Sequence, residues 1–292
     1  MDVLLPRTLE EALARKAERP EATPIAGGTD VMVLMNADLL RPEVMIDVSR
    51  LSELGGWRRE GDDLFVGAGV TYARILRELP EMRALVQASR AVGSPQIRNR
   101  GTVGGNLGTA SPAGDSLPVL AVHDARVVLA SAEREREIPW DAFLTGVKQT
   151  SLEPDELILG ARWRVLHGPQ SFAKVGTRNA MVISVASLCL ALDPVTRTAR
   201  VAMGSVAPTV IRAHEAETFL ADAMRRAGAW GDPPAPIAAG DVEAFAERVA
   251  AAAQPIDDIR GSAAYRRHAV RVLARRALAR AADEMAEEAL AS

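Results

Sequence analysis

The spacing of hydrophobic and polar positions predicts short strands and short helices in the first half of the chain. Thr8-Leu9-Glu10-Glu11 fits a capping box, in which Thr8 caps a helix and Glu11 reaches back, and Pro20 ends that helix. The elements expected after it are a strand at 23–26, a helix at 31–37 capped by Thr29 or Asp30, strands at 44–48 and 64–70, a helix to residue 79 capped by Thr71, a helix at 82–92, a helix from Leu117 capped by Asp115 or Ser116, and a strand at 125–130.

Residues 93–114 interrupt this periodicity, because glycine, serine and proline recur throughout the segment. An irregular segment of this length in a compact protein is usually functional or disordered. Its apolar residues Ile97, Val103 and Leu107 indicate that it is packed. We therefore interpret it as an ordered, irregular loop with a function.

The pattern changes near residue 165 to longer strands joined by turns. Strands over 171–175, 182–192 and 199–206 predict an antiparallel sheet, and Asp193-Pro194 forms the turn between the last two. A linker rich in glycine and proline follows at 228–240, ahead of helices over 242–253 and 262–290. The predicted fold class is α+β, with one domain over 1–165, itself divided near residue 55 into 1–55 and 56–165, and a smaller domain over 166–292.

The composition of the chain mainly excludes classes of function. The net charge is −3 and the pI is near 5.9, so nothing favours nucleic acid, whose binding proteins usually present a basic face. The longest apolar stretch, near 181–192, is shorter than the roughly 20 residues that span a bilayer. The first residues lack a basic leader followed by an apolar run. We therefore expect a cytoplasmic protein without a membrane span.

Metal ligands are scarce. Cys189 is the single cysteine, whereas an iron–sulfur cluster takes about four ligands, most of them thiolates. The four histidines are scattered without metal-ligand spacing. If redox metals take part in the activity, they belong to another chain.

Two double-glycine turns carry the candidate chemistry. Consecutive glycines permit positive φ and let a ligand approach the backbone without a Cβ in the way. Successive main-chain N–H groups then form a concavity that suits a pyrophosphate, and a helix start adds further N–H groups and its dipole. The first turn, Ala26-Gly27-Gly28-Thr29-Asp30, precedes such a helix. Taken alone, it is better explained as a plain strand-to-helix turn.

The second turn shifts the balance toward a ligand. Gly101-Thr102-Val103-Gly104-Gly105-Asn106-Leu107-Gly108-Thr109 is rich in glycine, but a flexible surface loop rarely carries Val and Leu at intervals. Facing the first turn, it would grip a diphosphate from the other side. A P-loop is excluded because the chain lacks Gly-x-x-x-x-Gly-Lys-Ser/Thr, and Gly67-Ala68-Gly69 lacks the third glycine of a Rossmann fingerprint.

In this order the motifs resemble the FAD-binding medium subunit of the molybdenum hydroxylases, the family of xanthine dehydrogenase and carbon monoxide dehydrogenase. The resemblance covers essentially the whole chain. It implies a two-part FAD-binding domain of the PCMH/VAO type, followed by a C-terminal domain of the carbon monoxide dehydrogenase flavoprotein type. Cys189 alone excludes those relatives that hold an extra iron–sulfur cluster in this subunit. The similar segments are the two glycine turns, Ile97-Arg98-Asn99, Ser111-Pro112-Ala113-Gly114-Asp115 and 257–266.

The resemblance also implies contacts with FAD, and several of these have a plainer alternative. Asp115 binds a hydroxyl of FAD or caps a helix, and Lys174 matches a strand lysine of the family, although taken alone it is better explained as a solvated side chain. Leu157 and Ile158 line the isoalloxazine ring or belong to the core. Arg98 offsets phosphate charge or forms a surface ion pair. The expected FAD-binding residues are Ala26, Gly27, Gly28, Thr29, Asp30, Ile97, Arg98, Asn99, Gly101, Thr102, Gly104, Gly105, Asn106, Thr109, Ser111, Asp115, Leu157, Ile158 and Lys174.

The implied function is that of an electron-transferring oxidoreductase subunit, with no catalytic or metal-binding residue of its own. Electrons leave a molybdenum cofactor on a large subunit, cross 2Fe–2S clusters on a small subunit, reduce the FAD held here, and pass to NAD or another acceptor. A dimer of heterotrimers is the expected assembly, and the xanthine dehydrogenase type is favoured. The alternatives are the flavin subunit of a carbon monoxide dehydrogenase or of another aromatic or N-heterocycle dehydrogenase, a stand-alone flavin oxidoreductase of the same fold, and a non-catalytic nucleotide-binding protein.

Overall fold

The computed structural model describes residues 1–291, and the chain forms two compact units. Unit 1 comprises Met1–Pro80, Val92–Ser111 and Asp124–Arg164, and unit 2 comprises Glu81–Ala91, Pro112–His123 and the chain from Val165 onward. The units are therefore not two consecutive segments. Helices α4 (Arg83–Ala91) and α7 (Leu117–Val122) pack on the sheet of unit 2, although their sequence neighbours belong to unit 1.

A small parallel sheet opens unit 1, in the order β1-β3-β2. Helix α1 precedes β2, and its start confirms the predicted cap: the Thr8 hydroxyl accepts from the Glu11 N–H at 3.1 Å. The Glu11 carboxylate reaches back one residue further than expected and accepts from the Arg7 N–H at 2.9 Å. The elements of this part are β1 (Asp2–Leu4), α1 (Leu9–Glu18), β2 (Thr23–Ile25), α2 (Val31–Asn36), β3 (Val44–Asp47) and a 3₁₀ turn, η1 (Ser52–Leu54).

The larger sheet of unit 1 is antiparallel, in the order β4-β5-β10-β6-β7. One core joins it to α1 and β3, with Phe65, Val128 and Leu157 packed against Ala12 and Ile46. The remaining elements of unit 1 are β4 (Trp57–Glu60), β5 (Asp63–Gly67), α3 (Tyr72–Glu78), α5 (Pro95–Arg100), α6 (Val103–Thr109), β6 (Arg126–Ala130), β7 (Glu135–Pro139), α8 (Trp140–Phe143), β8 (Leu144–Gly146), β9 (Gln149–Thr150) and β10 (Leu157–Arg164).

The segment 93–114 is more regular than the sequence predicted. It holds two short helices, α5 and α6, which begin at hydroxyl caps: Ser94 Oγ accepts from the Ile97 N–H, and Thr102 Oγ1 accepts from the Gly105 N–H at 3.0 Å. Each helix is too short for a hydrophobic period to appear in the sequence, so the expectation of an irregular loop was wrong. The caps were the signal that was present.

Unit 2 is built on an antiparallel sheet in the order β11-β12-β13-β14, which confirms the predicted C-terminal sheet. Strand β12 begins at Ala186 rather than near residue 182, and the Val182 carbonyl, ahead of the strand, accepts from the Lys174 ammonium. The strands are β11 (Gln170–Val175), β12 (Ala186–Asp193), β13 (Thr198–Gly204) and β14 (Ile211–Arg212).

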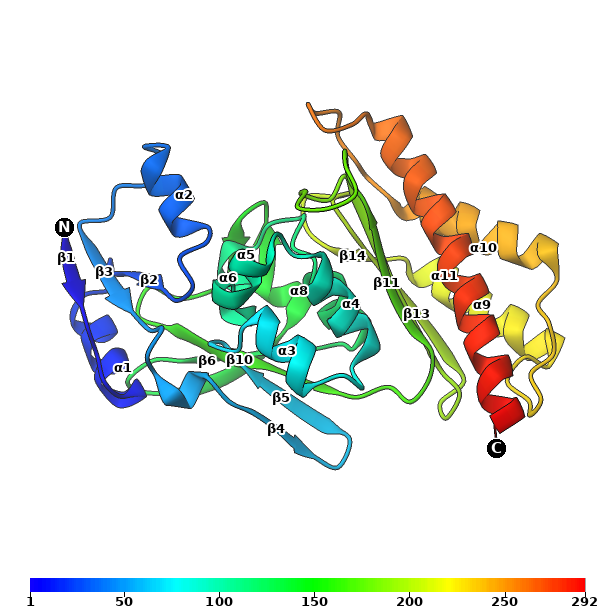
Figure 1. The fold of residues 1–292 in the computed structure, drawn as a ribbon, viewed down its shortest axis with the longest axis horizontal. Helices are drawn as coiled ribbons and strands as arrows, with labels where there is room; N and C mark the ends of the chain where they lie inside the picture. The colour runs from blue at the N-terminus through cyan, green and yellow to red at the C-terminus, as the bar shows by residue number, and fades with distance from the viewer. Residues whose placement is uncertain (292) are drawn as a thin grey trace. The chain divides into compact units, whose positions relative to one another are not determined.

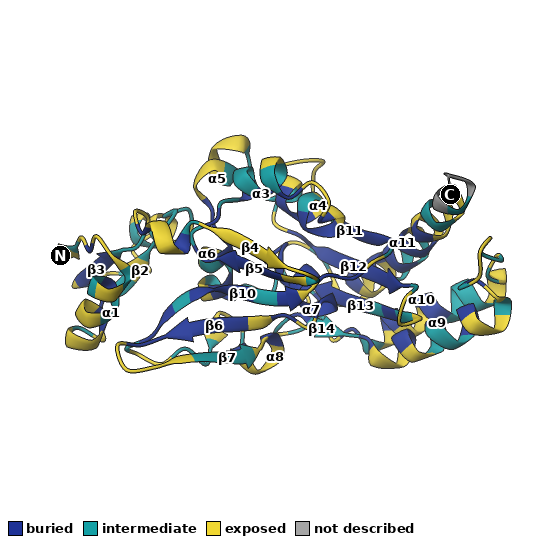
Figure 2. Ribbon diagram, turned by 90° about the horizontal axis from the view of Figure 1, so that it is seen from below, coloured by how far each residue is buried: buried dark blue, intermediate teal, exposed yellow. Residues whose placement is uncertain are grey.

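Helices cover both faces of this sheet. Helices α9 (His214–Ala227), α10 (Ala239–Ala252) and α11 (Ala263–Ala291) gather on one face over Leu188, Leu190 and Val201 (Figure 1). Helices α4 and α7 contact β11 to β14 from the other face, so β12 is buried along its whole length (Figure 2). Helix α9 is absent from the sequence prediction. Its N-terminal residue Ala213 gives no capping hydrogen bond, but the helical spacing of the buried Ala216, Leu220 and Met224 and the terminal Gly228 were usable signals.

Within residues 1–291, no helix combines the length and the apolar character that crossing a membrane requires.

Candidate functional site

The first glycine turn leaves its main-chain donors open. It links β2 to α2, and Gly28 adopts a φ of 74°, which favours glycine. The N–H groups of Gly27, Gly28, Thr29 and Asp30 donate to no acceptor within residues 1–291. Asp30 sits at the N-cap of α2 but makes no side-chain capping bond. Four successive donors are therefore available ahead of a helix, as an anion-binding turn requires.

The two glycine turns lie side by side. A Cβ on Gly27 would overlap the carbonyl oxygen of Arg100, immediately before the second turn. The Arg100 guanidinium in turn donates to the Gly27 carbonyl at 3.4 Å. Gly27 is thus required for close backbone approach, and the pairing predicted from the sequence is present in unit 1.

The second turn uses its main-chain donors internally. The Val103 N–H donates to the Val70 carbonyl at 3.0 Å, and the Gly104 N–H donates to the Ala68 carbonyl at 2.8 Å. A Cβ on Gly104 would lie 2.5 Å from the Ala68 Cβ. Gly104 therefore lets α6 pack on the end of β5. Ala68 thus occupies the space on the side of Gly104 where a side chain would lie, and the expected contact of Gly104 with FAD stays a prediction.

A bare strip on α6 does face outward. Gly105 and Gly108 are exposed and three residues apart, so they share one face of the helix. A Cβ on Gly105 would meet only Thr102 Oγ1 within 4 Å, at 3.1 Å, and one on Gly108 would meet only Ile158 Cδ1, at 3.5 Å. Each glycine costs a helix about 1 kcal/mol relative to alanine, and packing does not explain these two. Gly108 was not in the expected set, although its spacing from Gly105 was a usable signal.

The other expected residues of unit 1 divide between core and surface. Leu157 is buried in the core, whereas Ile158 is half-buried and faces Gly108. Arg98 donates to the Val92 and Gly93 carbonyls at 3.0 Å each, so it holds the chain ahead of α5. The remaining residues surround the two turns: Ala26, Gly101, Asn106, Thr109 and Ser111 are buried or half-buried, and Ile97 and Asn99 are exposed on α5.

Asp115 and Lys174 form a buried ion pair in unit 2. Lys174 Nζ lies 2.5 Å from Asp115 Oδ2 and also donates to the carbonyls of Ala91 at 2.8 Å and Val182 at 3.1 Å. The Ser184 hydroxyl donates to Asp115 Oδ1 at 3.3 Å. The pair connects β11, the loop before β12 and the segment ahead of α7. Lys174 is therefore not the solvated side chain that it would be on its own sequence evidence.

The pKa of the Asp115 carboxyl lies above its usual value, and burial is the largest cause. Burial raises the pKa of the Asp115 carboxyl, while the Lys174 ammonium and the Ser184 hydroxyl act in the opposite direction. The alternative role of Asp115 as a helix cap is not seen, because its carboxylate faces Lys174 and Ser184. Ser116 occupies the N-cap of α7, without a side-chain capping bond.

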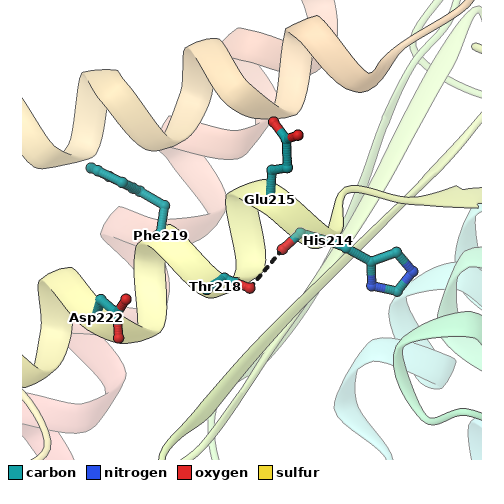
Figure 3. Close-up of a pocket in the computed structure, with 5 residues that line it drawn as sticks. All are labelled: His214, Glu215, Thr218, Phe219 and Asp222. Carbon is teal, nitrogen blue, oxygen red and sulfur yellow. Dashed lines mark hydrogen bonds between the residues drawn. The ribbon is translucent and has the colours of Figure 1, made fainter.

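A hollow on the surface of unit 2 holds none of the expected residues. It lies along α9 and is lined by His214, Glu215, Thr218, Phe219 and Asp222 (Figure 3). Its only internal hydrogen bond among these residues runs from the Thr218 hydroxyl to the His214 carbonyl at 3.1 Å. Across residues 1–291, no group of three His, Cys, Asp or Glu side chains is arranged to hold a metal ion.

Family models match both parts of the chain. The model described as "FAD binding domain in molybdopterin dehydrogenase" matches residues 1–162, more than half of the chain. The model described as "CO dehydrogenase flavoprotein C-terminal domain" matches residues 234–281. Both glycine turns fall within the first match.

Known proteins are similar along most of the chain. The nicotinate dehydrogenase FAD-subunit of Eubacterium barkeri is 37% identical over 194 residues, which cover 62% of this chain and 64% of that relative. A putative xanthine dehydrogenase FAD-binding subunit of Escherichia coli is 28% identical over 94% of this chain and 93% of its own length. The structure of carbon monoxide dehydrogenase from Hydrogenophaga pseudoflava superposes with a TM-score of 0.84 at 27% identity, covering 96% of each chain.

Proposed function

The chain belongs to the FAD-binding family of the molybdopterin dehydrogenases, and we propose that within such an enzyme it is the subunit through which electrons leave. As a member, it is an oxidoreductase subunit that carries FAD. In the proposed complex, a small subunit with 2Fe–2S clusters delivers electrons that come from a molybdenum cofactor on a large subunit. NAD or another acceptor then removes them.

The observation that carries the proposal is the row of open N–H groups from Gly27 to Asp30. Such a row, at the start of α2, stabilises the negative charge of a diphosphate. The bare strip at Gly105 and Gly108 lies on the helix that begins at the neighbouring turn, where a Cβ would meet almost no protein atoms. Both features fit FAD, which is elongated and anionic at its centre.

The residues of this chain have the tasks of binding and orienting the cofactor. When bound, FAD accepts one or two electrons at a time and passes on a hydride. The first turn fixes the diphosphate, α6 offers a smooth face for the neighbouring part of the ligand, and Ile158 shields that face from water. The roles of Thr109, Ser111, Asp115 and Lys174 toward FAD remain predictions.

We propose an N-heterocycle as the organic substrate, with xanthine first and nicotinate second. The names of two relatives, a xanthine dehydrogenase subunit and a nicotinate dehydrogenase subunit, support this class. Carbon monoxide is the alternative, supported by the carbon monoxide dehydrogenase structure. In either case the substrate binds to the molybdenum subunit, so this chain alone is expected to leave it unchanged. We also propose a cytoplasmic dimer of heterotrimers.

Purification from the native host tests the proposal. A tagged chain at its normal level should carry about one FAD and co-purify with molybdenum, iron and two further chains, and the sample should reduce NAD with xanthine or nicotinate. A chain that binds no FAD, even after the cofactor is added, would overturn the proposal. FAD without molybdenum or iron would instead support a stand-alone flavin oxidoreductase.

A further inference from the structure

Arg100 places a positive charge beside the first glycine turn. The side chain is exposed, and its Nε donates to the Gly27 carbonyl at 3.4 Å, within unit 1. The N–H groups at Nη1 and Nη2 donate to no acceptor within residues 1–291, and no carboxylate of that range pairs with them. Arg100 therefore adds unused donors and an unneutralised charge to the four open main-chain N–H groups at 27–30.

Main-chain contacts fix the point from which this side chain extends. A Cβ on Gly27 would overlap the Arg100 carbonyl oxygen, so the two main chains are in direct contact. Helix α5 ends at Arg100, and the next residue, Gly101, donates its N–H to the Ile97 carbonyl at 2.6 Å. The Gly101 carbonyl in turn accepts from the Tyr72 N–H at 3.1 Å. The guanidinium is therefore carried by ordered backbone at the edge of the first turn.

Arg98, the cation expected from the sequence to offset phosphate charge, has a different task. It is half-buried, and its guanidinium donates to the Val92 and Gly93 carbonyls. Residues two apart in a helix do not share a face, so Arg98 and Arg100 leave α5 in different directions. Arg98 holds the chain ahead of α5, and Arg100 is the arginine of this helix that lies at the glycine turn.

The needs of α5 do not account for the direction of Arg100. A cation in the last turn of a helix interacts favourably with the helix dipole, and Arg98 and Arg100 both occupy that turn. The Arg100 guanidinium, however, reaches a carbonyl 73 residues away in sequence rather than the last carbonyls of its own helix. A charge directed at the first turn indicates a role at that turn.

The first turn also carries a negative charge, which an anionic ligand has to overcome. Asp30 is the last residue of the turn, and its side chain is exposed and forms no capping bond with α2. A carboxylate beside the row of N–H groups repels a phosphate that approaches the same row. The Arg100 guanidinium offsets this repulsion, so the N–H groups can act on a diphosphate with their full dipoles.

We propose that Arg100 binds and neutralises the diphosphate of FAD at the first turn, with Nη1 and Nη2 donating to phosphate oxygen. This inference rests on the proposed function, because it takes FAD and its place at the turn from there. Arginine suits the task, since its guanidinium is always charged and presents paired donors that match the geometry of phosphate. Arg100 thus joins the expected FAD-binding residues, which did not include it.

Titration of the full-length apoprotein with FAD and with ADP measures the contribution of Arg100. ADP carries a diphosphate without the flavin. Arg100→Gln should weaken both ligands about tenfold at low salt, the typical effect of losing a charge-assisted hydrogen bond, and Arg100→Lys should restore part of the loss. Arg59→Gln is the matched control and should change neither affinity, because the exposed Arg59 also donates from Nε to a glycine carbonyl, that of Gly61, at 2.9 Å.

Salt distinguishes a charge that binds phosphate from a side chain that only braces the turn. The ratio of the Arg100→Gln and wild-type dissociation constants should fall between about 10 mM and about 1 M salt, because the Debye length shortens from about 30 Å to about 3 Å. Thermal unfolding of the two apoproteins should coincide.

Three results would overturn the role of Arg100 while leaving the proposed function in place. These are unchanged FAD affinity in Arg100→Gln, a loss for FAD without one for ADP, and a loss that is independent of salt and accompanied by a lower unfolding temperature. A wild-type apoprotein that does not bind FAD rejects the proposed function itself.

Discussion

The glycine turns of unit 1 and the Asp115–Lys174 pair of unit 2 are both expected to contact FAD, but they use their polar groups in opposite ways. In the first turn, four N–H groups from Gly27 to Asp30 have no acceptor within residues 1–291. In unit 2, Lys174 Nζ reaches Asp115 and two main-chain carbonyls, which together match its three protons. N–H groups without an acceptor at an ordered turn indicate a ligand. A buried charge whose hydrogen bonds are all made within the protein contributes first to the stability of the fold.

The same contrast separates neighbouring glycines on α6. Gly104 lies against Ala68, and its N–H is bonded to the Ala68 carbonyl. Gly105 and Gly108 face outward with almost no neighbouring protein atoms. One helix therefore combines a packing glycine with two that packing does not explain, and substitutions can separate the two kinds.

The largest expected effect is on the buried pair. Asp115→Ala leaves the Lys174 ammonium in a buried site with only the Ala91 and Val182 carbonyls, so the free energy of unfolding should fall by about 3–5 kcal/mol. Chemical denaturation of the apoprotein measures it. Asp222→Ala is the control, because Asp222 pairs with Arg225 on the surface and should cost less than about 1 kcal/mol. If Asp115→Ala loses FAD with little change in stability, the carboxylate serves the ligand first.

Removing the cation instead should make stability depend on pH. In Lys174→Met, burial continues to raise the pKa of the Asp115 carboxyl, and the ammonium no longer opposes it. The folded state then binds a proton that the unfolded state, with a pKa near about 3.9, releases. The loss in free energy of unfolding of Lys174→Met, relative to the wild type, should therefore become smaller as pH falls from neutrality through the raised pKa. The recovery should be about 1.4 kcal/mol for each unit by which the folded pKa exceeds the unfolded one.

The double variant Asp115→Leu/Lys174→Met tests the cause. Replacing both charges by apolar side chains removes the titrating group and leaves no unpaired ion, so stability should recover and the pH dependence should disappear. If the stability that Lys174→Met loses stays the same from neutral pH to about pH 4, the lost packing of the lysine side chain causes it, and the unpaired Asp115 carboxylate does not.

A smaller loss is expected at the packing glycine. Gly104→Ala places a Cβ 2.5 Å from the Ala68 Cβ, and such overpacking typically costs about 1–3 kcal/mol. Thermal unfolding of the apoprotein measures the loss. Ala68→Gly in the same chain should restore only part of it, because the Cα and the carbonyl oxygen of residue 68 would still lie 2.9 Å from the new Cβ. A Gly104→Ala protein that is as stable as the wild type but does not retain FAD would show that Gly104 serves the ligand rather than packing.

Local sequence signals predicted most of the fold. The caps at Thr8 and Thr71 and the long apolar runs of β12 and β13 act over a few residues, and the structure confirms the elements they indicate. Helix α9 has no capping side chain, and α5 and α6 are too short to show a period. Helix α9 forms through its packing on the sheet. Helices α5 and α6 form through caps within a glycine-rich segment whose composition favours a loop.

The candidate site depends on contacts that no local pattern contains. Arg100 and Gly27 are 73 residues apart in sequence, and Lys174 and Asp115 are 59 apart. The order of the motifs was enough to predict that the two turns meet. It did not reveal that Ala68 contacts Gly104, or that Gly108 extends the bare strip, because both follow from how α6 lies on β5 and β10.

The smallest effect on stability gives the sharpest test of the bare strip. Gly108→Ala adds a Cβ at ordinary contact distance, 3.5 Å from Ile158 Cδ1, so the apoprotein should gain about 0.5–1 kcal/mol from helix propensity. Gly105→Ala should gain less, because its Cβ lies 3.1 Å from the capping oxygen of Thr102. Both should weaken FAD binding about tenfold or more, equal to about 1.4 kcal/mol, in a flavin titration of the apoprotein.

General damage to the fold lowers stability and binding together, so higher stability with weaker binding can arise only if the added methyl group meets the ligand. Unchanged FAD affinity in both variants would mean that FAD lies elsewhere.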